Sequence, residues 1–277
     1  MRKLLSANNR YLFKNKLYWL ELLFCVVFSV WIAFANYSDK IQASANPLHL
    51  ENVFFNFYQI LCIAFAAVIS LIVGTEYSDG TIRNKVIVGH TRAEIYFSML
   101  ITNIEASVIA IAVHGVVTYG IGYSLFGGFT IPVGQIIAYI LCSLLANIVF
   151  TTIFVAIAMN CSNKSVTAVV SMIIAIVVVF VANIAGNKLI EPEMTYDSVT
   201  ITVDGIEYGD LVKNPNYVSG FMRSVLAFIY DFLPSGQLIQ IQQLNLDNPI
   251  YYALLSVLFF AVVTIVGYIL FRKKDIK

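Results

Sequence analysis

The chain has 277 residues, of which 59% are hydrophobic and only 12% are charged, whereas a soluble domain usually carries about 25% charged residues. A soluble fold of this length does not bury so much apolar surface, so the composition excludes an ordinary soluble domain and indicates a membrane protein. The net charge is only +1, which gives no bulk electrostatic signal for binding nucleic acid.

Six apolar runs are long enough to span a bilayer, which takes about 20 mostly apolar residues. They predict an all-α polytopic membrane protein that forms a single transmembrane domain over residues 1–277. The predicted spans are 17–35, 54–74, 95–122, 134–159, 166–185 and 250–271. All six prolines lie outside these runs or at their edges, as expected for uninterrupted helices. Asn248 and Pro249 supply an N-cap and a first helical residue for the last span.

Lysine and arginine predict the orientation, because they are enriched on the cytoplasmic side of membrane proteins. Lys40, Lys188, Lys213 and Arg223 fall on one side of the predicted spans. The other 13 of the 17 basic residues fall on the opposite side: Arg2, Lys3, Arg10, Lys14, Lys16, Arg83, Lys85, Arg92, Lys164, Arg272, Lys273, Lys274 and Lys277. We therefore expect both termini in the cytoplasm and residues 186–248 outside. The first run is longer than the apolar part of a signal peptide, so we interpret it as a span.

The first sixteen residues place apolar side chains among basic and polar ones. Leu4, Leu5, Tyr11 and Leu12 form the apolar part. This pattern predicts a helix over 1–16 in the cytoplasmic interface, which would offer its lysines to lipid phosphates. A solvated basic segment without such a helix is the alternative, and the sequence alone does not separate the two.

Residues 75–94 predict a short helix between two long ones. Ser78, Asp79 and Gly80 form a turn signal, and Thr81 can cap a helix from Ile82 to about Val88 that Gly89 closes. Thr91 and Glu94 then form a capping box at the start of the third span. This one short helix contains both basic and apolar residues. A simple cytoplasmic turn would not need a helix at this place.

The external segment 186–248 predicts two further features. Alternating residues 199–203 and 206–208, separated by Asp204 and Gly205, favour a β-hairpin with a type I′ turn. Residues 219–246 are apolar again, but Arg223, Asp231 and Pro234 interrupt them. We interpret this segment as a re-entrant or interfacial helical hairpin, because a seventh span would move the basic tail outside.

Motifs for enzyme chemistry are absent from the sequence. There is no GxxxxGK[ST], HExxH, GxSxG or CxxC pattern, so the chain does not bind a nucleotide through a P-loop. The three histidines are far apart and suggest no metal site. We expect the four cysteines to pack as small apolar residues.

Two ionisable residues lie deep inside the third predicted span, where charge is costly and often functional. Glu105 and His114 are nine residues apart, so they lie on opposite faces of a helix and are not expected to pair. Glu105 is a candidate to contact substrate or another subunit, or to accept a hydrogen bond from Asn103 or Asn147. A purely structural role is the alternative for both residues. Glu21 lies near the cytoplasmic end of the first span and is expected to reach the interface.

The second loop resembles the coupling-helix region of type-2 ABC exporter permeases, which include bacteriocin and lantibiotic transport and immunity permeases. The arrangement of an interfacial helix, six spans and an external hairpin before the last span also resembles this family. The residues that carry the resemblance are Glu76, Gly80, Thr81, Ile82, Arg83, Asn84, Lys85, Gly89, Arg92, Ile95 and Tyr96. A long acidic external loop is a departure from the family pattern.

The resemblance implies a permease in a bacterial plasma membrane that exports a peptide, drug or lipid-like substrate. It also implies membrane lipids, a second permease copy and two ATPase subunits as partners, with ATP and Mg²⁺ on the ATPase, no cofactor in this chain and no nucleic acid. On the ATPase, we expect Arg83 and Lys85 to meet acidic groups, and Ile82, Val86 or Ile87 to fill an apolar pocket. A proton- or ion-coupled carrier that uses Glu105, or a non-transporting membrane subunit, are the alternative functions.

Overall fold

The computed structural model describes residues 1–42, 48–56, 58–202 and 205–275. In this part of the chain, six helical segments are long and apolar enough to cross a membrane, which confirms the predicted all-α polytopic fold. Each predicted span falls on one of them. They are α2 (Lys16–Gln42), α4 (Tyr58–Ser78), preceded by the short α3 (Leu50–Phe54), α6 (Arg92–Phe126), α7 (Val133–Asn160), α8 (Lys164–Ile190) and α11 (Pro249–Lys273).

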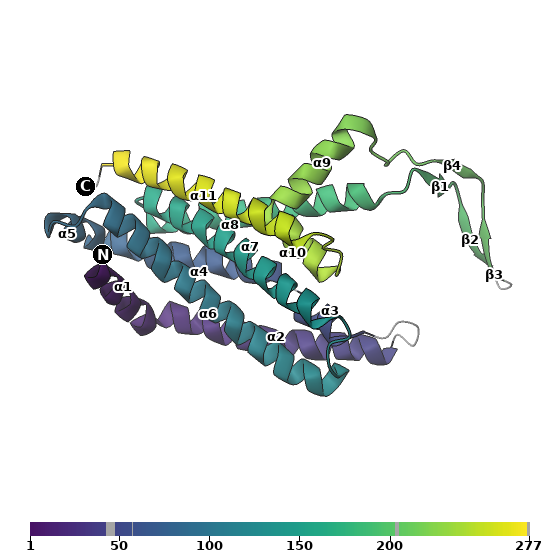
Figure 1. Cartoon of the computed structure of the whole chain (residues 1–277), viewed down its shortest axis with the longest axis horizontal. Helices are drawn as coiled ribbons and strands as arrows, with labels where there is room; N and C mark the ends of the chain where they lie inside the picture. Colours follow the sequence, from purple (N-terminus) through teal and green to yellow (C-terminus); the bar gives the residue numbers. More distant parts are fainter. Residues whose placement is uncertain (43–47, 57, 203–204, 276–277) are drawn as a thin grey trace.

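The start of α1 (Arg2–Lys14) and the end of α11 (Pro249–Lys273) lie at one end of the bundle, beside the short helix α5 (Thr81–Ile87), and the strands project from the opposite end (Figure 1). We call these the terminal end and the ribbon end. The shared end agrees with the predicted placement of the termini and the second loop on one side, although Lys277 lies outside the described residues. The amphipathic helix α1 packs against α6 through its buried face, so protein contacts hold it on the bundle.

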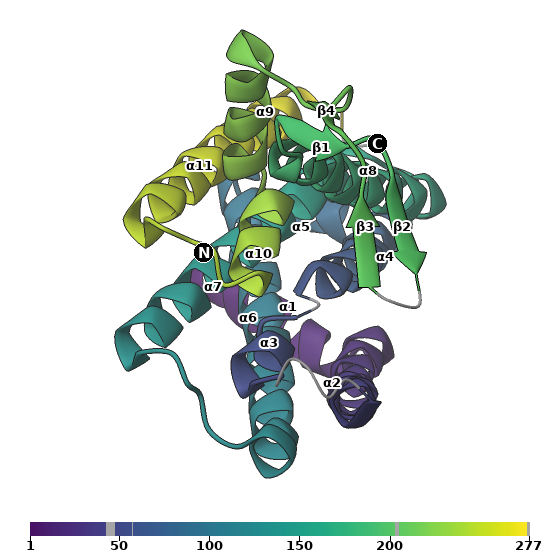
Figure 2. The same ribbon diagram turned by 90° about the vertical axis from the view of Figure 1, so that its right-hand side faces the viewer.

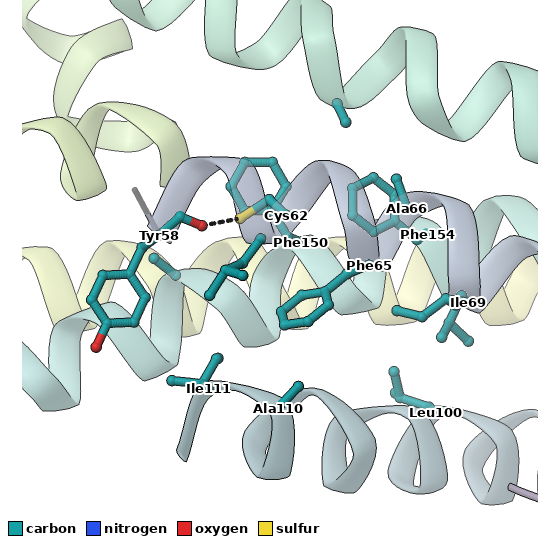
Figure 3. Close-up of a cluster of buried hydrophobic side chains, with 14 of the residues drawn as sticks. Tyr58, Cys62, Phe65, Ala66, Ile69, Leu100, Ala110, Ile111, Phe150 and Phe154 are labelled. Carbon is teal, nitrogen blue, oxygen red and sulfur yellow. Dashed lines mark hydrogen bonds between the residues drawn. The ribbon is translucent and has the colours of Figure 1, made fainter. Parts of the chain in front are cut away.

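Helix α4 runs through the centre of the bundle and packs on α7 and α8, while α6 packs on α2 and α7 (Figure 2). Figure 3 shows the resulting core, in which Phe65 and Cys62 of α4 lie beside Phe150 and Phe154 of α7. Large apolar side chains on α8 and α11, such as Phe180, are instead exposed. This distribution is expected for helices whose outer faces contact lipid.

The predicted hairpin is part of a longer two-stranded ribbon. Its strands are β1 (Met194–Tyr196), β2 (Val199–Thr202), β3 (Gly205–Tyr208) and β4 (Leu211–Lys213), with β1 paired to β4 and β2 to β3. The two ladders share one register and are joined by a hydrogen bond from the Asp197 amide to the Asp210 carbonyl. Gly205 pairs with Thr202, so it is a strand residue and its predicted turn position is wrong. Asp204 lies outside the described residues.

The segment before the last span folds into two short helices, α9 (Gly220–Phe232) and α10 (Pro234–Gln242), which confirms the predicted helical hairpin. The break falls at Leu233, with Pro234 in the first turn of α10, where its fixed φ suits a helix start. Helix α10 is buried between α7, α8 and α9. Its side chain Gln240 donates to Asp231 at 3.1 Å and accepts a bond from the Tyr252 hydroxyl at 2.6 Å.

Close packing of α11 on α7 requires a glycine at position 267. A methyl group there would lie 2.7 Å from the Cβ atom of Ala156 and 2.3 Å from the buried hydroxyl of Tyr96. We expect Gly267→Ala to lower the free energy of unfolding by about 1–3 kcal/mol, because the helices must separate to admit the methyl group. Thermal unfolding in detergent measures this change.

Gly120→Ala on α6 is the matched control, because nothing lies within 4 Å of its added methyl group. Alanine there should be neutral or stabilising by up to about 1 kcal/mol, since it favours the helix more than glycine does. Equal destabilisation by both substitutions would show that close packing between α7 and α11 does not require glycine at position 267.

Candidate functional site

The candidate site lies at the terminal end, where α5 connects α4 to α6. Gly80 precedes α5 with φ +67°, a left-handed conformation that glycine adopts without strain. At the other end, Gly89 has φ +98°, its amide donates to the Val86 carbonyl at 3.0 Å, and the His90 amide donates to the Lys85 carbonyl at 3.1 Å. This pair of bonds is the Schellman motif, which ends the helix within one residue.

These ends confirm most of the local prediction. The helix itself and its closure by Gly89 are as expected. Thr81 is not the N-cap: it is the first helical residue, and Gly80 takes the cap position without a side-chain bond. The capping box of α6 is confirmed, because Thr91 Oγ1 accepts from the Glu94 amide at 3.2 Å and the Thr91 amide donates to Glu94 Oε2 at 3.1 Å.

One face of α5 packs against the bundle and forms polar contacts with it. Ile82 is fully buried in the main core, and Val86 packs against the core. The Lys85 ammonium lies 2.5 Å from Glu76 Oε2 on α4 and donates to Asn8 Oδ1 on α1 at 2.9 Å. The two charged side chains are only 12% and 4% exposed, so each neutralises a charge that would otherwise be costly to bury.

The opposite face of α5 is open. It consists of Arg83, Asn84, Ile87 and Val88, which lie together because residues four apart share one side of a helix. Ile87 and Val88 are 70% and 77% exposed. Arg83 and Ile87 are therefore accessible to a partner, and their predicted contact with an ATPase stays a prediction. Lys85 and Ile82 instead face the bundle, which contradicts the expectation that Lys85 meets acidic groups of a partner and leaves Ile87, of the three apolar alternatives, on the open face.

Asn8 is the residue of this site that the sequence analysis missed. Its carboxamide nitrogen donates to Ser98 Oγ on α6 at 3.2 Å, while its oxygen accepts from Lys85. It therefore connects α1, α5 and α6. Its spacing could have indicated this role. Asn8 lies four residues from both Leu4 and Leu12, which places it on the buried face of an amphipathic helix.

Arg92 fastens the first turn of α6 to the end of α11. Its guanidinium donates to the carbonyls of Phe271 and Arg272 at 3.0 Å each, and also to that of Lys274. These carbonyls lie at the end of α11, where a helix leaves its last carbonyls without the usual bond from an amide four residues later. The Lys274 ammonium lies 3.9 Å from the centre of the Tyr77 ring on α4, and burial lowers its pKa to about 8. Arg92 thus joins helices within the chain.

Glu105 also contacts α1. Its Oε2 atom accepts from Asn9 Nδ2 at 2.7 Å, and the neighbouring Ala106 packs with Leu12 and Tyr18. Of the three alternatives for Glu105, a hydrogen bond from Asn103 or Asn147 is contradicted, because both amides donate to carbonyls of their own helices. Glu105 therefore lies level with the junction of α1 and α2, and its partner is an amide of the basic N-terminal helix.

The other polar residues predicted inside the membrane do not form hydrogen bonds with Glu105 in the described chain. Each bonds to its own neighbours: His114 Nδ1 lies 2.6 Å from Ser29 Oγ, Asn103 Nδ2 donates to the Met99 carbonyl at 2.8 Å, and Asn147 Nδ2 donates to the Ser143 carbonyl at 2.7 Å. Glu21 is buried, and one of its carboxylate oxygens has no hydrogen-bond partner among the described residues, so the prediction that it reaches the interface is wrong. Within the described chain, these side chains form no common polar site.

Because Lys85 forms a buried ion pair and Arg83 does not, we expect removal of these two cations of α5 to have unequal effects on stability. Lys85→Ala leaves Glu76 buried without a partner, which should cost about 3–5 kcal/mol of stability. Arg83→Ala on the open face should change stability by less than about 0.5 kcal/mol. Replacing both buried charges, by Glu76→Gln with Lys85→Met, should recover much of the loss. Thermal unfolding in detergent compares the variants, and equal effects of Lys85→Ala and Arg83→Ala would contradict the buried pair.

Comparison with known protein families agrees with this geometry. The family model of the ABC-2 family transporter proteins matches residues 12–182, which include α5, four of the six long helices in full and most of α8. No curated protein sequence matches the chain. The match covers more than half of the chain and includes the element that carries the candidate site. The chain therefore belongs to the ABC-2 family of transporter proteins.

Proposed function

We propose that this chain is the permease subunit of an ABC exporter and that the open face of α5 docks on a separate ATPase subunit. Membership in the ABC-2 family implies an ABC ATPase partner. The observation that carries the docking site is the division of α5 into two faces. Lys85 and Ile82 fix the helix to the bundle, while Arg83, Ile87 and Val88 face outward. Arginine is enriched in interface hot spots, and the exposed Ile87 and Val88 add apolar surface beside it.

The connections of α5 support a mechanism for transmitting motion. The chain connects α5 directly to α4, which packs on α7 and α8, and to α6, which packs mainly on α1 and α2 and also on α7. A displacement of α5 would therefore act on two groups of helices at once. Closure of the ATPase around ATP and Mg²⁺, which the partner would bind, would move these groups relative to each other and alternate access to the substrate.

The same proposal places the terminal end in the cytoplasm and the ribbon outside, in accord with the distribution of basic residues. The complete exporter would contain two permease copies and two ATPase subunits in a bacterial plasma membrane. Its substrate would be a peptide, a drug or a lipid-like molecule.

The contacts of Glu105 favour this proposal over a proton- or ion-coupled carrier. Proton- and ion-coupled carriers commonly use ionisable groups inside the bundle that pair with one another along a pathway. Glu105 instead bonds to Asn9, and His114 to Ser29. Co-purification of an ATPase distinguishes the exporter from both the carrier and a non-transporting subunit.

Charge reversal on the open face tests the docking site. We expect Arg83→Glu to weaken ATPase binding roughly five- to thirtyfold, the effect of losing about 1–2 kcal/mol at an interface. Lys213→Glu on the exposed ribbon is the control, because it makes the same charge change far from α5. Co-purification of the ATPase and stimulation of its hydrolysis measure the effect. An inserted, stable Arg83→Glu permease that binds its ATPase normally would remove α5 as the docking element.

Cysteine labelling tests the orientation. In a cysteine-free background, a single cysteine at position 213 should react with a membrane-impermeant maleimide on intact cells, and one at position 83 should react only after permeabilisation. Both positions carry exposed side chains, so access to reagent is not limiting. Reaction at 83 without reaction at 213 in intact cells would reverse the proposed orientation.

A further inference from the structure

Helix α1 has a second face that the contacts with α5 and α6 do not use. A shallow surface cavity of about 430 Å³ lies on it and is lined by Lys3, Ser6, Ala7, Arg10, Tyr11 and Lys14. The three cations recur at spacings of seven and four residues, which places them along one side of the helix. In the described part of the chain, none of them forms an ion pair with a carboxylate.

The chemistry of this cavity suits a phosphate group. Three cations and two hydroxyls, those of Ser6 and Tyr11, are all able to donate hydrogen bonds to anionic oxygens. Burial, followed by the nearby carboxylates of Glu76 and Asp79, raises the pKa of Tyr11, so its hydroxyl keeps its proton. The cavity therefore presents donors to a ligand rich in acceptors.

The surroundings of the cavity indicate that this phosphate belongs to a lipid. Helix α1 leads directly into the first span, and exposed aromatic side chains mark the junction. Trp19 donates from Nε1 to the Phe13 carbonyl at 2.8 Å, and both rings are exposed. Tryptophan and tyrosine gather at the level of lipid headgroups, so the cations of α1 lie where anionic headgroups are concentrated.

We propose that the outer face of α1 binds the phosphate headgroup of an anionic phospholipid and that this binding holds Asn8 against Lys85. Arg10 and Tyr11 on the outer face lie within one turn of Asn8 on the inner face. Because a helix is stiff over one turn, a headgroup that immobilises the outer face also fixes the position of Asn8. The lipid thereby stabilises the contact between α1 and α5. This inference goes beyond docking of the ATPase and is tested on the permease alone.

Lipid binding by the full-length permease in detergent gives the first test. Native mass spectrometry compares added phosphatidylglycerol with phosphatidylcholine. The wild-type chain should prefer phosphatidylglycerol, and Arg10→Gln with Lys14→Gln should lower its affinity about 25-fold, because each cation near an anionic lipid contributes about fivefold. The control pair, Arg272→Gln with Lys273→Gln, removes two exposed cations at the same end of the bundle outside the cavity and should leave the affinity nearly unchanged.

Three results would overturn the lipid site. An equal loss of affinity in the control pair would reduce the effect to general surface charge. Displacement of the lipid by equimolar glycerol phosphate would show a site for a soluble phosphate ester. Loss of ATPase co-purification from the Arg10 and Lys14 variant in lipid-free detergent would assign this face to a protein partner.

Hydrogen exchange tests the connection to α5. Phosphatidylglycerol should slow amide exchange in both α1 and α5 of the wild-type permease, and only in α1 of Asn8→Ala, because Asn8 carries the contact between them. Lipid binding that leaves exchange in α5 of the wild-type chain unchanged would overturn the proposed connection, whatever the role of the ATPase. The ATPase is absent from the lipid-binding and hydrogen-exchange measurements themselves, so failure of the docking proposal would leave both interpretable.

Discussion

The ammonium group of Lys85 bonds to side chains of two other helices, and the packing at the terminal end of the bundle depends on these bonds. It meets Glu76 of α4 and Asn8 of α1 while belonging to α5 itself. Removing two charges from water is costly, and a buried pair persists only where additional hydrogen bonds complete it. Asn8 accepts one of these bonds through its side-chain oxygen and donates another from its side-chain nitrogen to Ser98 of α6. The relative positions of α1, α4, α5 and α6 are thus tied to one side chain.

A second polar cluster performs a similar task at the ribbon end. Gln240 of α10 and Tyr252 of α11 both bond to Asp231 of α9, and burial raises the pKa of that carboxyl group. The core between the two ends is mostly apolar (Figure 3). Apolar packing in a membrane holds helices together without choosing one rotation strongly, whereas a buried polar contact is satisfied in only one arrangement. The two clusters therefore specify how the helices meet.

The sequence predicted the elements of this fold well and their faces poorly. The spans follow from hydropathy because the bilayer selects long apolar helices. Capping chemistry located α5, Thr91 and Asn248 because these signals are local. The faces of α5 could not be predicted, because seven residues hold too few turns for a periodicity, and because Glu76 and Asn8, which decide where Lys85 points, come from other helices. The burial of α10 is likewise set by packing against helices distant in sequence.

The bonding of Arg92 has a consequence for how this family can vary in sequence. Glu76 and Lys85 recognise each other through their side chains, so a change in one demands a change in the other, and the two positions should covary among relatives. Arg92 instead bonds to main-chain carbonyls, which every residue type supplies. The bond to Arg92 therefore places no demand on the side chain at position 272, which is exposed. An alignment would show an arginine that is kept at position 92 and that has no covarying partner at position 272.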